Sequence, residues 1–407
     1  MNPEAIRSRF SLIAKRVYLN AASEGPMPAE AVREAERMAR LKETPWEIGS
    51  HYYYRVPAEV RARLEKLLAA PAGSVALVAG TSAGIGLAAQ RLPLQAGDEV
   101  LLLGSQFPSN TYPWRAAARR GASVRVVARP LGTDPTPPLL DALGPATRVV
   151  SIDWVNFVDG ATVDLEAVGS ACRDRGITFV VDAAQGLGAL RLDVVKAGID
   201  ILAAPSHKWL LGPVGLGFVY VAPRLLDTLQ PWNAGWVNIA SRTGFRNLLQ
   251  LAGDPPADAT RFETGSPPYS LLAPWGVSLD LLAEAGAEAV EGRILSLASR
   301  AREGILELSA SAAGRSRGLT LLSSAPLPDP GRGAGGPEGS RREPRAAHRS
   351  GIVSFRAGER PGALYRALES EEITAALRED AIRISPHIYN TESDIDALLA
   401  CCARFLA

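Results

Sequence analysis

A lysine and an aspartate that follow two apolar strands suggest carbonyl chemistry. Lys208 lies in the turn Ser206–Trp209, 26 residues after Asp182. The run Thr178–Val181 ends at the acid and the run Ile201–Ala204 leads into the lysine turn, as expected of buried strands that end at one sheet edge. A lysine amine can form a Schiff base with a pyridine aldehyde, and a carboxylate can keep the ring nitrogen protonated. The pair therefore predicts a site for such a cofactor.

A glycine- and hydroxyl-containing segment, Gly80–Gly84, follows the first predicted strand and opens a helix. Backbone N–H groups at a helix N-terminus, together with the hydroxyls of Thr81 and Ser82, can hold a phosphate. The alternative is an ordinary helix cap. A Schiff-base lysine implies a cofactor phosphate, which favours phosphate binding over an ordinary cap. His207, beside Lys208, could reach this phosphate or transfer protons, whereas a metal role is not expected because no second ligand lies at a suitable spacing.

Three further side chains follow predicted strands on the same edge of the sheet. Phe107 could cover one face of an aromatic cofactor by stacking, or it could close the core as a loop aromatic. Asn156 could donate a hydrogen bond to the ring oxygen of the cofactor or to a substrate carboxylate, and Gln185 could serve the ring oxygen. Asn and Gln in such turns often satisfy local backbone groups instead, so the alternatives stay open.

Arg383 interrupts an apolar strand between two isoleucines, Ile382 and Ile384. A buried guanidinium needs a partner, and its planar fork suits a carboxylate. A substrate carboxylate and a structural salt bridge are both compatible with the pattern.

Seven short apolar runs predict the strands of a large α/β domain. Most of the segments between them are long enough for a crossover helix, so we expect a mostly parallel sheet with both faces covered. Residues 207–216 are too short for a helix, which predicts that the last two strands are antiparallel neighbours. Ligands of such sheets bind beyond the carboxyl ends of the strands. The predicted strands are Val75–Ala79, Glu99–Leu103, Val124–Val127, Val149–Ile152, Thr178–Val181, Ile201–Ala204 and Gly217–Val221.

The C-terminal part predicts a smaller α+β domain. One long helix, Ser278–Ala310, precedes strands at Leu319–Leu322, Gly351–Phe355 and Ala381–Ile384. The intervening segment 324–350 is rich in Pro, Gly and Arg and predicts a mobile surface loop. We expect a large domain of residues 20–274 and a small domain of residues 1–19 and 275–407.

Composition is that of an ordinary globular enzyme. Of the 407 residues 47% are hydrophobic and 21% are charged, and the formal net charge is +1, which gives no electrostatic reason to expect nucleic acid or a membrane as partner. The chain has no long apolar run or signal-like start, so a cytoplasmic location is expected. Its three cysteines, Cys172, Cys401 and Cys402, are expected to be buried structural thiols.

The order of these motifs resembles the class V aminotransferase superfamily, a group of fold-type-I pyridoxal 5'-phosphate (PLP) enzymes. That group includes cysteine desulfurases, selenocysteine lyases, kynureninases and proteins similar to isopenicillin N epimerase. The likeness runs from Tyr18–Ala22 to Tyr389–Thr391, nearly the whole chain. The motifs that carry it are Gly80–Ser82, Phe107–Asn110, Asp182–Gln185, Ser206–Trp209, Glu263–Ser266 and Arg383–Pro386.

The resemblance implies a role for each site residue. Lys208 would be the Schiff-base lysine, Asp182 the partner of the ring nitrogen and Arg383 the residue that binds the α-carboxylate of an amino-acid substrate. The remaining assignments are Gln185 at the ring oxygen, Thr81, Ser82 and His207 around the phosphate, Phe107 and Asn156 around the ring, and Ala22 and Asn156 beside the substrate. Ser206 is a further candidate for cofactor binding, and whether it takes the place of a serine found in many relatives stays open. Gly265 and Ser266, from a neighbouring subunit, would complete the phosphate site, which implies a homodimer.

Departures from the family pattern reduce the number of reactions that are expected of this chain. Desulfurases have histidine where this chain has Phe107, and many relatives have serine where it has Pro205. Residues 373–382 contain no cysteine, whereas desulfurases carry a nucleophilic cysteine shortly before the arginine. Persulfide-forming desulfuration is therefore not expected.

β-Elimination, as in C–S cleavage of a cysteine derivative, is the favoured reaction because it needs no protein thiol. Transamination and epimerisation are the alternatives. Cofactor binding without catalysis is disfavoured because the acid, lysine and arginine are all present. Trp46 and the segment His51–Tyr54 could line a pocket for a bulky substituent, or they could serve packing or dimer contact.

Overall fold

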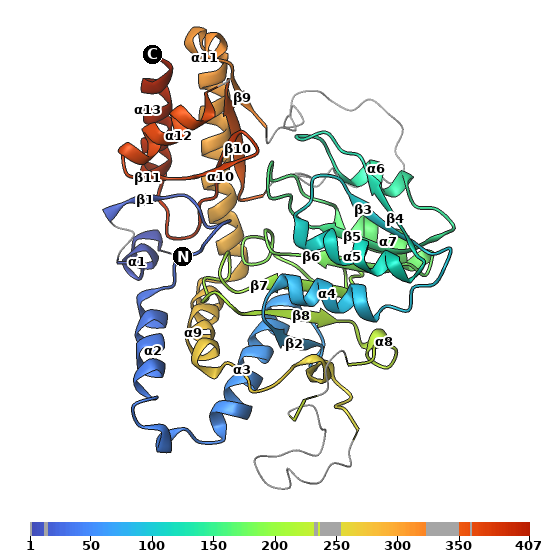
Figure 1. Ribbon diagram of the computed structural model, residues 1–407. Helices are drawn as coiled ribbons and strands as arrows, with labels where there is room; N and C mark the ends of the chain where they lie inside the picture. Colours follow the sequence, from blue (N-terminus) through green and yellow to red (C-terminus); the bar gives the residue numbers. More distant parts are fainter. Residues whose placement is uncertain (1, 12–14, 232–234, 237–253, 323–349, 359) are drawn as a thin grey trace, which may run out of the picture.

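A seven-stranded sheet is the core of the larger part of the molecule, and Figure 1 shows how its strands are arranged in the computed structural model. The structure describes residues 2–11, 15–231, 235–236, 254–322, 350–358 and 360–407. The strand order is β2-β8-β7-β6-β5-β3-β4, and every pair is parallel except the two that β8 makes. The strands are β2 (Val75–Val78), β3 (Glu99–Leu103), β4 (Ser123–Val127), β5 (Thr147–Asp153), β6 (Thr178–Asp182), β7 (Ile201–Pro205) and β8 (Gly217–Val221).

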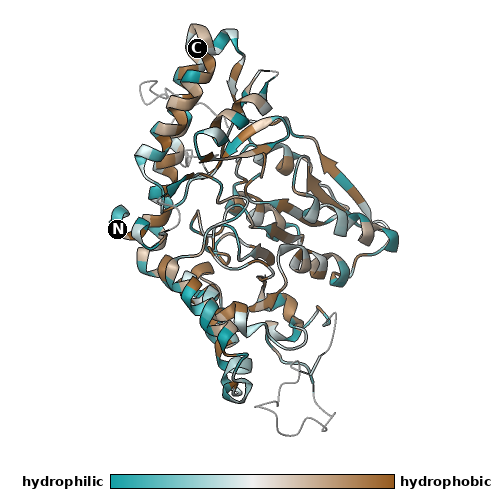
Figure 2. Cartoon of the chain, turned by 60° about the vertical axis from the view of Figure 1, so that its left-hand side comes forward, coloured by the Kyte–Doolittle hydropathy of each residue, from teal (hydrophilic) through white to brown (hydrophobic). Residues whose placement is uncertain are grey.

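This sheet confirms the predicted fold, including the antiparallel contact between β7 and β8. Every residue of these two strands is buried, because hydrophobic clusters cover both faces of the sheet. The helices that follow the strands in this part are α4 (Thr81–Arg91), α5 (Tyr112–Ala117), α6 (Thr136–Asp141), α7 (Leu165–Asp174) and α8 (Pro223–Leu226). Figure 2 shows hydrophobic residues concentrated in the interior and hydrophilic ones along the outer helices.

A four-stranded antiparallel sheet in the C-terminal part has the order β12-β13-β10-β9. Its strands are β9 (Leu319–Leu321), β10 (Val353–Ala357), β12 (Ala376–Arg378) and β13 (Ala381–Ile384). The helices α11 (Ala312–Ser316), α12 (Pro361–Ser370) and α13 (Glu392–Leu406) belong to this part. The short strand β1 (Val17–Tyr18) pairs in parallel with β11 (Ile373–Thr374), so the start of the chain lies against the C-terminal part.

The prediction of one long helix over Ser278–Ala310 is wrong in two respects, because two helices cover this region and the first of them begins earlier, at Tyr269. They are α9 (Tyr269–Ala285) and α10 (Ala287–Ala310). Gly286 separates them with a φ of 83° and a ψ of 128°, a conformation that residues with a Cβ rarely adopt. Helix α9 packs against two N-terminal helices, α2 (Ala29–Arg40) and α3 (His51–Leu68).

Further predictions concern a loop, the domain boundaries, the cysteines and membrane-spanning segments. The predicted loop 324–350 lies outside the described residues apart from Ser350, which is buried. The domain boundaries stay a prediction. The three cysteines are buried, and burial raises the pKa of the Cys172 and Cys402 thiols to about 12. No helix in the described ranges is long and apolar enough to cross a membrane.

A buried ion pair fixes the loop that follows β4. Arg129 and Asp159 lie 2.8 Å apart, and both side chains are almost fully buried. The Asp159 carboxylate also accepts hydrogen bonds from the backbone N–H groups of Gly132 and Ala161. Removing one partner of a buried pair leaves an uncompensated charge.

We predict that Arg129→Met lowers the free energy of unfolding by about 3 kcal/mol. The pair of Arg125 and Glu99, in which the arginine is exposed, supplies the control, since Arg125→Met should cost less than about 1 kcal/mol. Urea denaturation of the parent and both variants measures the difference. Equal effects of the two substitutions would contradict the structural role of the buried pair.

Candidate functional site

The carboxyl edge of the large sheet brings Asp182 and Lys208 into electrostatic contact. Asp182 is the last residue of β6 and pairs in register with Ala203 of β7, whose following turn carries the lysine. The aspartate is only 4% exposed, and its Oδ1 accepts a hydrogen bond of 2.9 Å from the Ala184 N–H. Burial raises the pKa of Asp182 to about 6, while the Ala184 bond and Lys208 oppose the rise.

The lysine turn is held by backbone contacts on two sides. Within the turn, the Ser206 N–H donates to the Leu216 carbonyl and the Gly212 N–H donates back to Ser206. From the N-terminal segment, the Gly25 N–H donates to the His207 carbonyl at 2.7 Å. A Cβ on Gly25 would stand 1.9 Å from the Lys208 carbonyl oxygen, so only glycine permits this close crossing.

The Lys208 amine lies beside an aromatic ring. Its Nζ is 5.5 Å from the ring centroid of Phe107. Burial lowers the pKa of Lys208, and Asp182 opposes this effect most strongly. Phe107 itself is 41% exposed and makes an edge contact with Phe157. The structure therefore presents this ring to the site, and Phe107 does not close the core.

The N-terminus of α4 has properties that fit a phosphate. Its N-cap is Gly80, and no side chain caps the helix. The Oγ1 of Thr81 and the Nδ1 of His207 are both buried without a hydrogen-bond partner among the described residues. The Ser82 hydroxyl bonds to the Ser109 hydroxyl at 2.8 Å. Free N–H groups and orphaned polar atoms at a helix start are what a bound phosphate would satisfy.

Two of the proposed cofactor-binding side chains, those of Asn156 and Ser206, are engaged with backbone groups. The amide of Asn156 donates to the Ser105 carbonyl, and its oxygen accepts from Val158 and Asp159. The Ser206 hydroxyl faces the carbonyl oxygens of Pro213 and Leu216. These side chains fix the loops around the site, as the local alternative for Asn156 predicts, and their cofactor roles stay predictions.

Gln185 links the lysine turn to the N-terminal segment. Its Oε1 accepts from the Trp209 indole and its Nε2 donates to the Ala22 carbonyl, both at 3.0 Å. The Ala22 N–H donates to the Ser385 hydroxyl. Ala22 therefore lies where the large sheet, the lysine turn and the small sheet meet, as a substrate-contacting position would require. Contacts of Gln185 or Ala22 with cofactor or substrate stay predictions.

Arg383 lies on β13 with the side chain directed at the same junction. It is 2% exposed, and its guanidinium donates to the Phe157 carbonyl at 2.8 Å and to the Ser23 hydroxyl at 2.7 Å. Its Nε has no partner. Over the described part of the chain, no carboxylate lies within ion-pair distance of Arg383, so the structural salt bridge considered from sequence is absent there.

Asp153 is a site residue that the sequence analysis missed. It ends β5 and pairs in register with Asp182, so two buried carboxylates lie side by side. Burial and Asp182 raise the pKa of Asp153. Its oxygens accept from the Phe107 N–H at 2.7 Å and from the Asn110 amide at 3.1 Å. An acid at the end of a predicted strand, the same signal that identified Asp182, could have revealed it.

Gly265 and Ser266 are exposed in a loop whose base is fixed to the subunit. Glu263, just before them, pairs with Arg61 at 2.9 Å and accepts from the Leu77 N–H. A Cβ on Gly265 would meet nothing within 4 Å. This tip is free to reach another molecule, and its predicted role in a neighbouring subunit stays a prediction.

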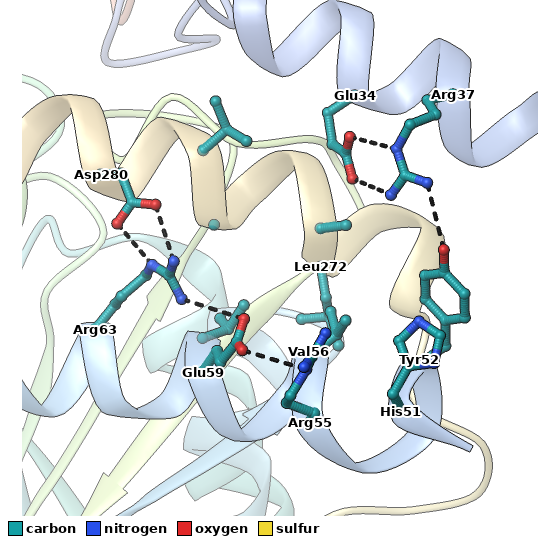
Figure 3. A pocket seen from close by; sticks show the side chains of 14 residues that line it. Glu34, Arg37, His51, Tyr52, Arg55, Val56, Glu59, Arg63, Leu272 and Asp280 are labelled. Carbon is teal, nitrogen blue, oxygen red and sulfur yellow. Dashed lines mark hydrogen bonds and ion pairs between the residues drawn. The ribbon is translucent and has the colours of Figure 1, made fainter. Parts of the chain in front are cut away.

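The N-terminal aromatic residues lie around a different cavity. It has a volume of about 320 Å³, lies among α2, α3 and α9, and is lined in part by His51 and Tyr52. Figure 3 shows that ion pairs surround it, including Glu34 with Arg37 and Arg63 with Asp280. None of the proposed cofactor-binding residues lines this cavity. Trp46 is 79% exposed.

Comparison with known proteins places this geometry in a family context. Residues 47–318 match the family model described as aminotransferase class-V. The chain is 31% identical over 423 aligned positions to isopenicillin N epimerase from Streptomyces clavuligerus, which covers 97% of this chain and 96% of the relative. It is 30% identical to a probable cysteine desulfurase from Methanothermobacter thermautotrophicus, over 72% of each chain.

Solved structures share the fold. A complex of the cystine C–S lyase C-DES with its product cysteine persulfide superposes with a TM-score of 0.81 at 23% identity, over 97% of this chain and 99% of the other. A cysteine desulfurase from Thermococcus onnurineus superposes with a TM-score of 0.82 at 19% identity, over 100% and 98%. A further C-DES structure contains glycine linked to the PLP cofactor.

We predict that Asp182→Asn stabilises the cofactor-free protein at neutral pH. The folded pKa of about 6 lies above the ordinary 3.8, so the folded state binds the proton more tightly and stability is lost as pH rises through this window. The asparagine variant lacks this loss. Its unfolding free energy should exceed that of the parent by up to about 3 kcal/mol above pH 6, and the difference should vanish near pH 4.

Denaturation curves of the cofactor-free proteins at several pH values measure this difference. Asp174→Asn, at an exposed carboxylate, is the matched control and should leave the pH profile unchanged. A constant difference between the Asp182 variant and the parent across pH 4–8 would refute the electrostatic account.

Proposed function

This chain belongs to the aminotransferase class-V family, and from that premise we propose that it is a β-eliminating lyase that cleaves the C–S bond of a cysteine derivative. Class-V enzymes use PLP, so the chain is a PLP-dependent enzyme. PLP supplies an aldehyde that condenses with amines and a ring that accepts the electrons of a bond broken at the α-carbon. The residues of this chain decide which bond breaks.

Lys208 is the residue that we assign to covalent attachment and to proton transfer. The other lysines, at positions 15, 42, 66 and 196, are all exposed, whereas Lys208 is shielded beside Asp182 and Phe107. Because burial lowers its pKa, the neutral amine needed to attack an aldehyde or to remove an α-proton is more accessible. Asp182 would hold the proton on the ring nitrogen, and Thr81, Ser82 and His207 would bind the phosphate.

Arg383 is assigned to the substrate's α-carboxylate. The observation that supports it is the uncompensated buried charge: its partners in the described chain are a carbonyl and a hydroxyl. A carboxylate would form charge-assisted hydrogen bonds with this fork. We expect Gly265 and Ser266 of the partner subunit to complete the phosphate site of a homodimer.

One observation favours elimination over sulfur transfer. The three cysteines of the chain are buried in α7 and α13, and none lies on β11, β12 or the turn before Arg383. A reaction that ends with release of sulfur to solvent fits this arrangement, and one that needs a protein persulfide does not. The C-DES structures that share this fold include one described as a cystine C–S lyase, which is consistent with the proposal.

Epimerisation is the second candidate, supported by the likeness to isopenicillin N epimerase along 97% of the chain. The reactions have different products. Elimination releases pyruvate, ammonium and a thiol, epimerisation exchanges the α-proton without pyruvate, and transamination leaves the cofactor as pyridoxamine phosphate. Incubation of the holoenzyme with S-substituted cysteines therefore decides among them, and α-proton exchange without pyruvate would contradict the lyase.

We predict that Lys208→Ala abolishes turnover, because the amine that attaches the cofactor and takes the proton is lost. Lys196→Ala is the control, since the Lys196 side chain lies on the surface in an ion pair with Glu166. Pyruvate release should fall at least about a thousandfold in the first variant and stay at the parent level in the second. Normal turnover by the Lys208 variant would refute its assignment.

A further inference from the structure

Two arginines of the small sheet converge on one hydroxyl at the candidate site. Arg378 lies on β12 and Arg383 on β13. Their strands pair in the register Ala376 with Arg383 and Arg378 with Ala381, so the two arginine side chains are diagonal neighbours on one face of the sheet. The Ser23 hydroxyl accepts from Nη2 of Arg383 at 2.7 Å and from Nη2 of Arg378 at 3.2 Å.

This arrangement places two positive charges together without a counter-ion. Arg378 otherwise donates to the Leu377 carbonyl, and in the described ranges no carboxylate lies within ion-pair distance of either guanidinium. Burial, together with the charge of Arg378, lowers the pKa of Arg383 to about 9. Like charges that share one neutral acceptor are destabilising unless an anion joins them.

The two guanidiniums differ in their exposure to solvent. Arg383 is 2% exposed, while Arg378 is exposed at the edge of the sheet, next to the turn formed by Glu379 and Asp380. An α-carboxylate at Arg383 would supply one negative charge and leave that of Arg378 unmatched. The charge of Arg378 also lowers the pKa of Lys208, so this guanidinium lies near enough to the amine to meet the end of a substrate side chain.

We propose that Arg378 is a second anion-binding residue and that the substrate is an amino acid whose side chain ends in an acidic group. This inference rests on the proposed function, in which Arg383 holds the α-carboxylate. For the lyase it specifies a cysteine derivative whose S-substituent carries a carboxylate. Arg378 then determines specificity by contact with the substrate and takes no part in bond breaking.

Binding of unreactive probes to the holoenzyme tests this site without turnover. Glutarate and its monoamide, glutaramate, differ only in whether the second end is charged. A charge-assisted hydrogen bond at a partly exposed site corresponds to a preference of about tenfold for glutarate, measured by titration calorimetry. Arg378→Gln should reduce this preference to about one.

Arg16→Gln is the matched control. Arg16 is exposed and its Nε donates to Thr374 of β11, so this variant removes a positive charge from the same part of the surface without touching Ser23. The preference for glutarate should persist in it. Loss of the preference in both variants would show that it comes from the general positive potential of this surface, which overturns the proposal. Equal weakening of both probes by Arg378→Gln would show that both arginines hold one carboxylate, which also overturns it.

Turnover separates this proposal from the lyase assignment. S-(2-carboxyethyl)cysteine and its carboxamide form a second matched pair. The kcat/KM of the parent should be about tenfold higher for the acid, because its KM is lower. Glutarate preference without pyruvate release from either compound would support Arg378 and refute the lyase. Pyruvate release from both compounds at equal kcat/KM would support the lyase and refute the role of Arg378.

Discussion

The burial of an amine beside a carboxylate at one edge of a sheet is the constraint on which the rest of the site depends. Asp182 and Lys208 are both shielded from water, and desolvation shifts the pKa of each toward the neutral form. Such a pair is costly unless each group has a task or a partner. The parallel contact between β6 and β7 places both at the same edge, and the backbone bond from Gly25 holds the lysine turn there.

The site is assembled from three parts of the chain that are distant in sequence. The large sheet contributes the lysine and two aspartates, and the small sheet contributes Arg383 and Arg378. The N-terminal segment joins them: Asn20 bridges to Ser385, and Ser23 accepts from both arginines. Under the proposed roles, chemistry at the α-carbon and selection of the substrate would reside on different sheets, so substrate preference could vary without disturbing the lysine and its acid.

The sequence was sufficient for the large sheet because its strands are short, apolar and separated by helix-length segments. Thr178–Val181 and Ile201–Ala204 were located to within one residue. The break at Gly286 was missed because α9 and α10 have continuous helical periodicity, and one glycine within such a pattern is often tolerated. The short strands β11 and β12 were not predicted because a run of two or three residues has no measurable period.

Long-range partners were the part of the site that sequence could not supply. Local motifs identified Lys208, Asp182 and Thr81. The hydrogen bonds of Asp153 to the Phe107 loop and the shared contact of two arginines with Ser23 join residues tens or hundreds of positions apart. Such contacts follow from strand register and loop crossing, which a single sequence does not specify.

Chemical trapping of the cofactor provides the most direct test of the central claim. Borohydride reduction of the PLP-loaded protein fixes the cofactor to the amine that carries it, and peptide mass spectrometry locates the label. We predict one pyridoxyl-phosphate group per chain, attached to Lys208. A label on any other lysine, or a fully loaded protein whose Lys208 peptide remains unmodified, would contradict the account.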